Sequence, residues 1–254
     1  MKETINTGDM VWSDINGARR YTANNTDNKT KRAKNTSEIL LGAMQYAENY
    51  LKAMKQLNAY DTSSIIKSDS SWLQKHSFDE FKVRGSKVTI DPGRICCIDY
   101  GKTYKGEISY FHYGLCVSRK EEKLLIIPMT SANDWRDTCY HPVKKPSATK
   151  KYRQGLRSEG FSKDCVLLMN DAKFISAGRI DRQDVEINPD TLKEIQQQLF
   201  AVCFPNINTK FKTVTDKLDG LDKKIKDKDE LIARLKDSND ILNKKLLTYE
   251  KSTQ

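Results

Sequence analysis

Short apolar runs alternate with turn residues through the middle of the chain. They follow the turn Asp91-Pro92-Gly93 and occupy residues 94–100, 110–118, 123–130, 164–169 and 173–175. Short runs of this kind, separated by turn residues, predict β-strands. Several such strands close together in sequence are typical of a small barrel or a strongly curved sheet.

Apolar residues at helical spacing lie on both sides of this region. Between residues 36 and 59 they recur every three or four positions, and Asn35 with Glu38 resembles a capping box. A second, short helix is predicted at residues 70–82, before the break at Arg84-Gly85-Ser86. A third is predicted at residues 190–204, because Asn188-Pro189 is a typical helix start.

Residues 206–254 carry a heptad pattern that predicts a self-associating coiled coil. Lys228 and Asn239 are the polar exceptions, and a buried Asn can fix the register of a parallel pair. The alternative is a solvated helix that folds back on the N-terminal helix. The predicted seam is Phe211, Val214, Leu218, Leu221, Ile225, Lys228, Ile232, Leu235, Asn239, Leu242, Leu246 and Tyr249.

These patterns divide the chain into four parts and predict an α+β protein. Residues 1–35 are polar and hold too little apolar surface to offset the entropy of folding, so we expect a mobile arm. Residues 36–89 form a helical extension, and residues 90–205 form the barrel domain with its terminal helix. Residues 206–254 form the coiled-coil helix.

Composition excludes a helical membrane protein. Of the 254 residues, 37% are hydrophobic, and the longest apolar run, residues 124–129, is far shorter than the ~20 residues of a membrane span. The N-terminus has no hydrophobic stretch of the kind found in secretory signals, so we expect a cytoplasmic protein. The net charge of +10 suits an anionic partner such as nucleic acid.

The six cysteines show no CxxC pair and no histidine at zinc-ligand spacing. Most of them lie inside apolar runs, which favours reduced thiols in the core. We therefore expect neither a metal site nor a cofactor.

A basic segment at residues 140–158 is the first candidate for binding. It has no acidic residue before position 159 and interleaves two aromatic rings, Tyr140 and Tyr152, with cations. Cations and rings together suit single-stranded nucleic acid, since phosphates meet the charges and bases stack on the rings. The alternative is a solvated basic loop. The cations are Lys144, Lys145, Lys150, Lys151, Arg153 and Arg157.

Two strand positions are candidates for chemistry. Alternation along residues 111–117 places His112, Gly114 and Cys116 on the face opposite the bulkier side chains. Gly114 would leave space beside His112, as a groove would, although a lone histidine is more often a hydrogen-bonded surface residue. Thr130 and Ser131 follow the apolar run at residues 123–129, where hydroxyls usually satisfy local backbone groups.

Taken in order, these segments resemble the MazF/PemK family of toxin ribonucleases. The resemblance covers the core domain, under half of the chain. It implies a small SH3-like barrel of the type shared by CcdB, MazF and PemK. It also implies metal-independent cleavage of single-stranded RNA that leaves a cyclic phosphate and a 5′-hydroxyl. The matching segments are Gly93–Tyr100, Gly106-Glu107, Gly114–Ser118, Ile127–Ser131, Asp164–Leu168, Lys173, Ile175 and Arg179-Ile180.

The resemblance also implies roles for individual residues. His112 stands where the family has an arginine, and Thr130 matches the family's threonine. We expect His112 to act as general acid or base, and Thr130 with Ser131 to hold the scissile phosphate. Lys173 would add charge, and Glu107 would orient His112 or a base. Because histidine lacks the permanent charge of arginine, the replacement permits either a histidine mechanism or weakened cleavage.

Two other functions compete with the ribonuclease. One is a nucleic-acid-binding module without catalysis, and the other is a CcdB-like toxin that poisons a partner enzyme. The resemblance implies an antitoxin partner in addition to RNA. We also expect a homodimer, formed through the coiled coil, and consider the helix at residues 36–59 a candidate lid over the barrel.

Overall fold

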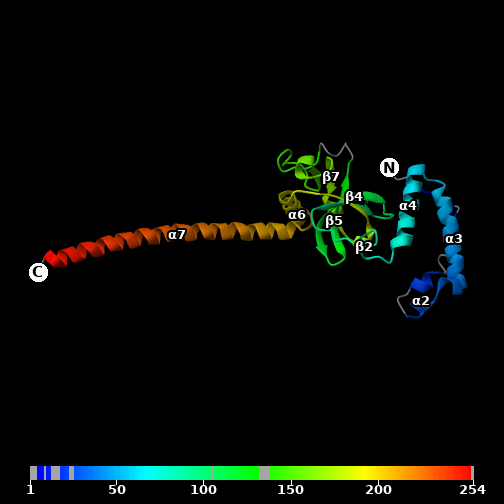
Figure 1. Cartoon of the computed structure of the whole chain (residues 1–254), viewed down its shortest axis with the longest axis horizontal. Coiled ribbons are helices and arrows are strands. Elements are labelled where there is room, and N and C mark those ends of the chain that lie inside the picture. The colour runs from blue at the N-terminus through cyan, green and yellow to red at the C-terminus, as the bar shows by residue number, and fades with distance from the viewer. Residues whose placement is uncertain are drawn as a thin grey trace. The chain divides into compact units, whose positions relative to one another are not determined.

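The structure is a computed structural model that describes residues 5–8, 10–12, 18–22, 26–104, 106–131 and 138–252 (Figure 1). Within that range, the side chains of residues 19, 20 and 246–252 are not described. Parts of the predicted arm, and the seam side chains of Leu246 and Tyr249, therefore lie outside the description. The chain divides into two compact units, Met1–Leu192 and Lys193–Gln254.

The N-terminal part of the first unit is helical. Its elements are η1 (Arg19–Thr22), α2 (Thr26–Thr30), η2 (Ala33–Asn35), α3 (Ser37–Met54) and α4 (Ala59–Lys75). The predicted cap at Asn35 is wrong, because α3 begins after Thr36. The predicted start of the next helix is also wrong. Asn58 caps α4 by accepting a 2.8 Å hydrogen bond from the backbone N–H of Asp61, and the helix ends at Lys75.

A seven-stranded antiparallel sheet follows, beyond a small hairpin of β1 (Lys82–Val83) and β2 (Ser86–Lys87), so the α+β prediction is confirmed. The strands run in the order β6-β7-β5-β4-β3-β9, and β8 pairs with β5 outside this order. The strands are β3 (Arg94–Asp99), β4 (Phe111–Lys120), β5 (Lys123–Thr130), β6 (Tyr152–Gly155), β7 (Cys165–Leu168), β8 (Lys173–Ser176) and β9 (Ile180–Glu186).

The sheet changes partners along β5. The first half of β5 pairs with β8, its last two residues pair with β7, and β4 lies along its other edge. No pairing joins β6 to β9 in the described part of the chain, so the sheet does not close into a barrel. Three short 3₁₀ turns connect the later strands, namely η3 (Arg157–Glu159), η4 (Met169–Asp171) and η5 (Ala177–Arg179).

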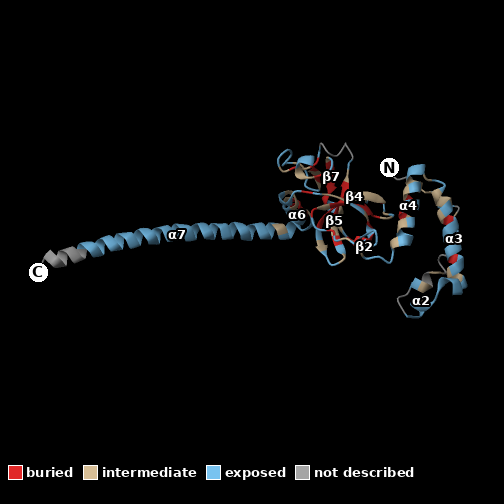
Figure 2. Ribbon diagram, viewed as in Figure 1, coloured by how far each residue is buried: buried red, intermediate tan, exposed pale blue. Residues whose placement is uncertain are grey.

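The core lies on the sheet, where the buried residues of Figure 2 gather. One buried cluster packs Ile98, Tyr100, Cys116 and Ile126 with residues from β8 and β9. Five cysteines are buried free thiols, and Cys203 is exposed. Burial raises the pKa of the Cys96 and Cys165 thiols to about 12, so they pack as apolar groups at neutral pH.

The last two helices are α6 (Pro189–Cys203) and α7 (Pro205–Ser252). Ile195, Gln198 and Leu199 form the buried side of α6. In α7, every residue up to Lys245 is exposed except the half-buried Asn208. No helix in the described ranges is both long and apolar enough to cross a membrane.

Candidate functional site

His112 and Thr130 lie together, as the sequence predicts for a shared site. Gly114 of β4 pairs with Pro128 of β5, and each of the two residues lies two positions beyond this pair, toward the same end of the sheet. Both line the same two cavities. We call the first, of about 490 Å³, pocket A. The second, of about 380 Å³, is pocket B.

Pocket A combines hydroxyls with cations. Thr130 and Ser131 line it beside His112, and the exposed residues Arg157 and Lys163 lie in the same wall. None of the described residues that line pocket A is acidic. Its fixed charges are therefore positive, which suits a phosphate group. Arg157 was predicted to bind RNA from the basic segment, whereas Lys163 was not predicted.

Pocket B is acidic and aromatic. Glu107 and Tyr152 line it with His112 and Thr130, so four of the predicted site residues meet there. Asp171 also lines pocket B and was not predicted. Burial raises the pKa of the Asp171 carboxyl, while the nearby Lys173 acts in the opposite direction. Pocket B can accept hydrogen bonds from the edges of a base.

His112 is half-buried, and this burial lowers the pKa of its imidazole. The neutral ring is therefore favoured at pH 7, because desolvation penalises the charged form. A neutral imidazole has one nitrogen that can accept a proton. A general base must be neutral to accept a proton, so this direction of the pKa shift is compatible with that one of the two roles expected for His112.

The space predicted beside Gly114 does not exist. A side chain at this position would overlap the hydroxyl of Tyr100 and Cγ2 of Ile126. Leu115 and Val117 on the opposite face of β4 are as buried as Cys116, so strand alternation alone cannot establish a groove on the face that carries Gly114. His112 reaches pockets A and B because it lies near the end of β4, where this face opens.

The prediction that Arg153 binds RNA is wrong. Residues 152–155 form the strand β6 instead of a loop, and Arg153 is only 1% exposed. Its guanidinium pairs with the carboxylate of Glu159, 2.6 Å away. A buried and paired guanidinium cannot serve as a surface phosphate contact.

The remaining predicted cations lie outside pockets A and B. Lys173 is on β8, with its Nζ 5.2 Å from the centroid of the Tyr100 ring. Lys150 lies over the ring of Tyr140, also at 5.2 Å. The exposed residues Lys144, Lys145 and Lys151 remain candidates for contacts with RNA beyond the pockets.

Helix α4 borders the site, although the sequence pointed to residues 36–59 as the segment covering the sheet. Ser68 of α4 donates a 2.8 Å hydrogen bond to the carboxylate of Asp99 at the end of β3. Lys67 places its Nζ 3.8 Å from the centroid of the Phe111 ring, which lines pocket A. Helix α4 thus adds a cation next to pocket A.

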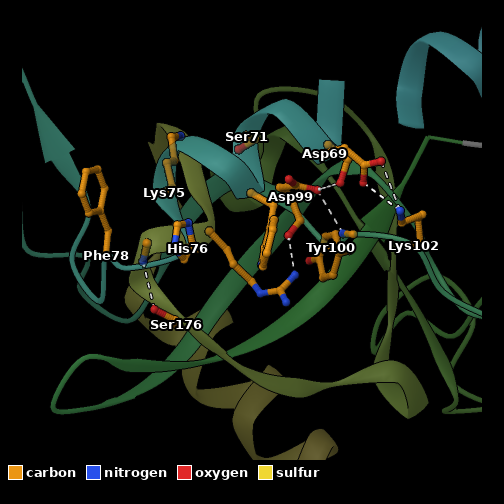
Figure 3. Close-up of a pocket in the computed structure, with 14 residues that line it drawn as sticks. Asp69, Ser71, Lys75, His76, Phe78, Asp99, Tyr100, Lys102 and Ser176 are labelled. Carbon is orange, nitrogen blue, oxygen red and sulfur yellow. Dashed lines mark hydrogen bonds and ion pairs between the residues drawn. The ribbon is translucent and has the colours of Figure 1, made fainter. Parts of the chain in front are cut away.

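A third cavity, pocket C, lies between α4 and the sheet and has a volume of about 560 Å³ (Figure 3). Lys75 at the end of α4 and the following His76 line one side, and Asp99 and Arg179 line the other. Arg179 donates a 3.0 Å hydrogen bond to the backbone oxygen of Asp99. Sequence reasoning missed pocket C because its residues come from segments far apart in the chain.

No protein-family model matches the chain, and no curated protein matches its sequence.

Proposed function

We propose that the chain is a metal-independent endoribonuclease that cleaves single-stranded RNA, with its sheet arranged as in SH3-like MazF/PemK toxins. The observation that carries the proposal is that His112 and Thr130 line pockets A and B together, with Arg157 and Lys163 in pocket A. Cleavage through a 2′-hydroxyl needs a base to accept its proton and positive charge or hydrogen bonds to stabilise the phosphate, and these side chains can supply both.

In the proposed reaction, neutral His112 accepts the proton of the ribose 2′-hydroxyl. The 2′-oxygen forms a bond to phosphorus, the bond from phosphorus to the 5′-oxygen breaks, and the 5′-oxygen takes a proton from solvent. Arg157 and Lys163 stabilise the charge that develops on the phosphate, and the hydroxyl of Thr130 positions it. The products are a 2′,3′-cyclic phosphate and a 5′-hydroxyl.

A mixed single-stranded RNA, incubated with the protein in chelator, tests this proposal. Cuts with cyclic phosphate ends are expected, and DNA of the same sequence stays intact because it lacks the attacking hydroxyl. His112→Ala should slow cleavage by about 10²-fold or more, the usual contribution of a general base. His76→Ala, a histidine outside pockets A and B, is the matched control and should cleave at the wild-type rate.

A nucleic-acid-binding module is the second candidate, favoured by the histidine at the position of the family's arginine. RNA binding without cuts by folded protein would select it. Equal cleavage by the wild type and His112→Ala would contradict the proposed chemistry. The expected antitoxin would occupy pocket A in competition with RNA.

A further inference from the structure

Helix α7 presents to solvent an apolar stripe that only Lys228 and Asn239 interrupt between Phe211 and Leu242. With Phe211 as position a of a heptad, positions a and d fall along one side of the helix for its whole described length. The apolar members of the stripe are all exposed, Phe211 by 67%. The a positions are Phe211, Leu218, Ile225, Ile232 and Asn239, and the d positions are Val214, Leu221, Lys228, Leu235 and Leu242.

The same register extends back to the end of α6. Ile207 in the first turns of α7 takes position d, and Phe204, between the two helices, stands at the preceding a position; both are exposed. A strict seven-residue repeat over this length is the pattern that supercoils two helices around each other. Helices in proteins gain most of their stability from packing an apolar face, so α7 is more stable when another surface covers its apolar stripe.

We propose that α7 pairs with α7 of a second copy of this chain in a parallel, in-register, two-stranded coiled coil. Ile225 and Ile232 at a, with Leu235 and Leu242 at d, are the choices that favour two strands. In this alignment, Asn239 faces Asn239 of the other copy and the two amides can bond to each other. This pairing of Asn239 with its copy would fix the register of the two helices.

Charges beside the stripe decide between parallel and antiparallel pairing. In a parallel pair, each g position faces the e position of the next heptad on the partner helix. Lys217 then faces Asp222, and Lys224 faces Asp229, so both pairs are attractive. An antiparallel pair brings g against g and e against e, so the two lysines at g no longer face the aspartates at e.

The paired helices would link two copies of the chain, each of which carries one candidate site. Each chain enters the coiled coil at Pro205, so residues 1–204 of both copies precede the same end of a parallel pair. This inference stands apart from the proposed ribonuclease, because it rests on α7 alone.

Disulfide trapping of the full-length chain tests the alignment. Cys203→Ser first removes the exposed native thiol. Leu235→Cys at position d should then cross-link to the same residue of a second copy under mild oxidation, giving a particle of twice the 29.2 kDa chain mass. Asp237→Cys at the outward position f is the matched control and should give at least tenfold less cross-linked dimer. Equal trapping at both positions would overturn the parallel register.

Two further sets of variants, one that exchanges the g and e charges and one that replaces Lys228 in the stripe, test self-association by sedimentation. Lys217→Glu with Lys224→Glu in one chain, and Asp222→Lys with Asp229→Lys in another, should each weaken self-association at least tenfold. Mixing the two variants should restore a dimer, since opposite charges then face each other. Lys228→Leu should tighten the wild-type dimer at least tenfold. A wild-type chain that stays monomeric at about 50 μM would overturn the proposal. So would a Lys228→Leu variant that self-associates no more tightly than the wild type.

Discussion

Arg153 and Glu159 form an ion pair within the sheet unit. Nη2 of Arg153 lies 2.6 Å from one carboxylate oxygen of Glu159, and Nη1 lies 3.2 Å from the other. The same carboxylate accepts a 2.9 Å hydrogen bond from the backbone N–H of Leu156. Glu159 therefore ties β6 to the turn η3, whose first residue is Arg157 of pocket A.

Glu159→Ala should destabilise the protein by about 3 kcal/mol, because it leaves the buried guanidinium of Arg153 without its counter-charge. Urea unfolding followed by tryptophan fluorescence measures the change. Replacing both partners, Arg153→Met with Glu159→Leu, should cost less than the sum of the single changes, since no buried charge is left alone. A loss below 0.5 kcal/mol for Glu159→Ala would show that the pair contributes only as much as a surface pair.

Most strands of the sheet could be predicted because their apolar runs are continuous. Strand β5 begins and ends where the pattern places it, and β3, β4, β7 and β8 differ by a few residues at their ends. Strands β6 and β9 were missed, because Tyr152–Gly155 and Ile180–Glu186 are mostly polar. Their pairing comes from neighbouring strands, which a local pattern does not contain.

Two residues of the candidate site could be predicted from the sequence, whereas the roles of the basic residues could not. The resemblance placed His112 and Thr130 as catalytic residues, and the register of β4 and β5 brings them to the same end of the sheet. Composition could not separate Arg153, which pairs with Glu159, from Arg157, which lines pocket A. Only the fold decides which cation of a basic segment is buried.

Ser68→Ala should loosen the contact between α4 and β3. The hydroxyl of Ser68 donates to the carboxylate of Asp99, and both residues are buried. Losing a hydrogen bond to a charged group costs about 1.5–3 kcal/mol. Unfolding measurements should show this loss, and proteolysis after Lys75 should become faster. Ser70→Ala, at an exposed position of the same helix, should change neither.

Gly114→Ala should destabilise the core by about 1–3 kcal/mol, the usual cost of overpacking. The added carbon would meet Ile126 and the hydroxyl of Tyr100. That hydroxyl is buried and has no hydrogen-bond partner in the described part of the chain. Tyr100→Phe alone should therefore leave stability unchanged or raise it, and it should recover part of the loss caused by Gly114→Ala. Thermal unfolding of the three variants checks this, and strictly additive effects would contradict the contact.

The lowered pKa of His112 makes both cleavage and stability depend on pH. The general base must be neutral, so the cleavage rate should be constant around pH 7 and fall only in acid, below the ordinary histidine pKa of 6.5. Stability follows the same direction. Between the folded pKa and 6.5, the unfolded chain binds a proton at His112 that the folded chain does not, so acid favours unfolding.

His112→Gln, which does not titrate, isolates this contribution to stability. The free energy of unfolding of the wild type minus that of His112→Gln should be larger at pH 7.5 than at pH 5.5, since only the wild type loses stability through position 112 as the pH falls. His76 and His141 are present in both proteins, so their titration cancels to first order in the difference. Urea unfolding at the two pH values measures it. A difference that is independent of pH would show that burial leaves the pKa of His112 at its ordinary value.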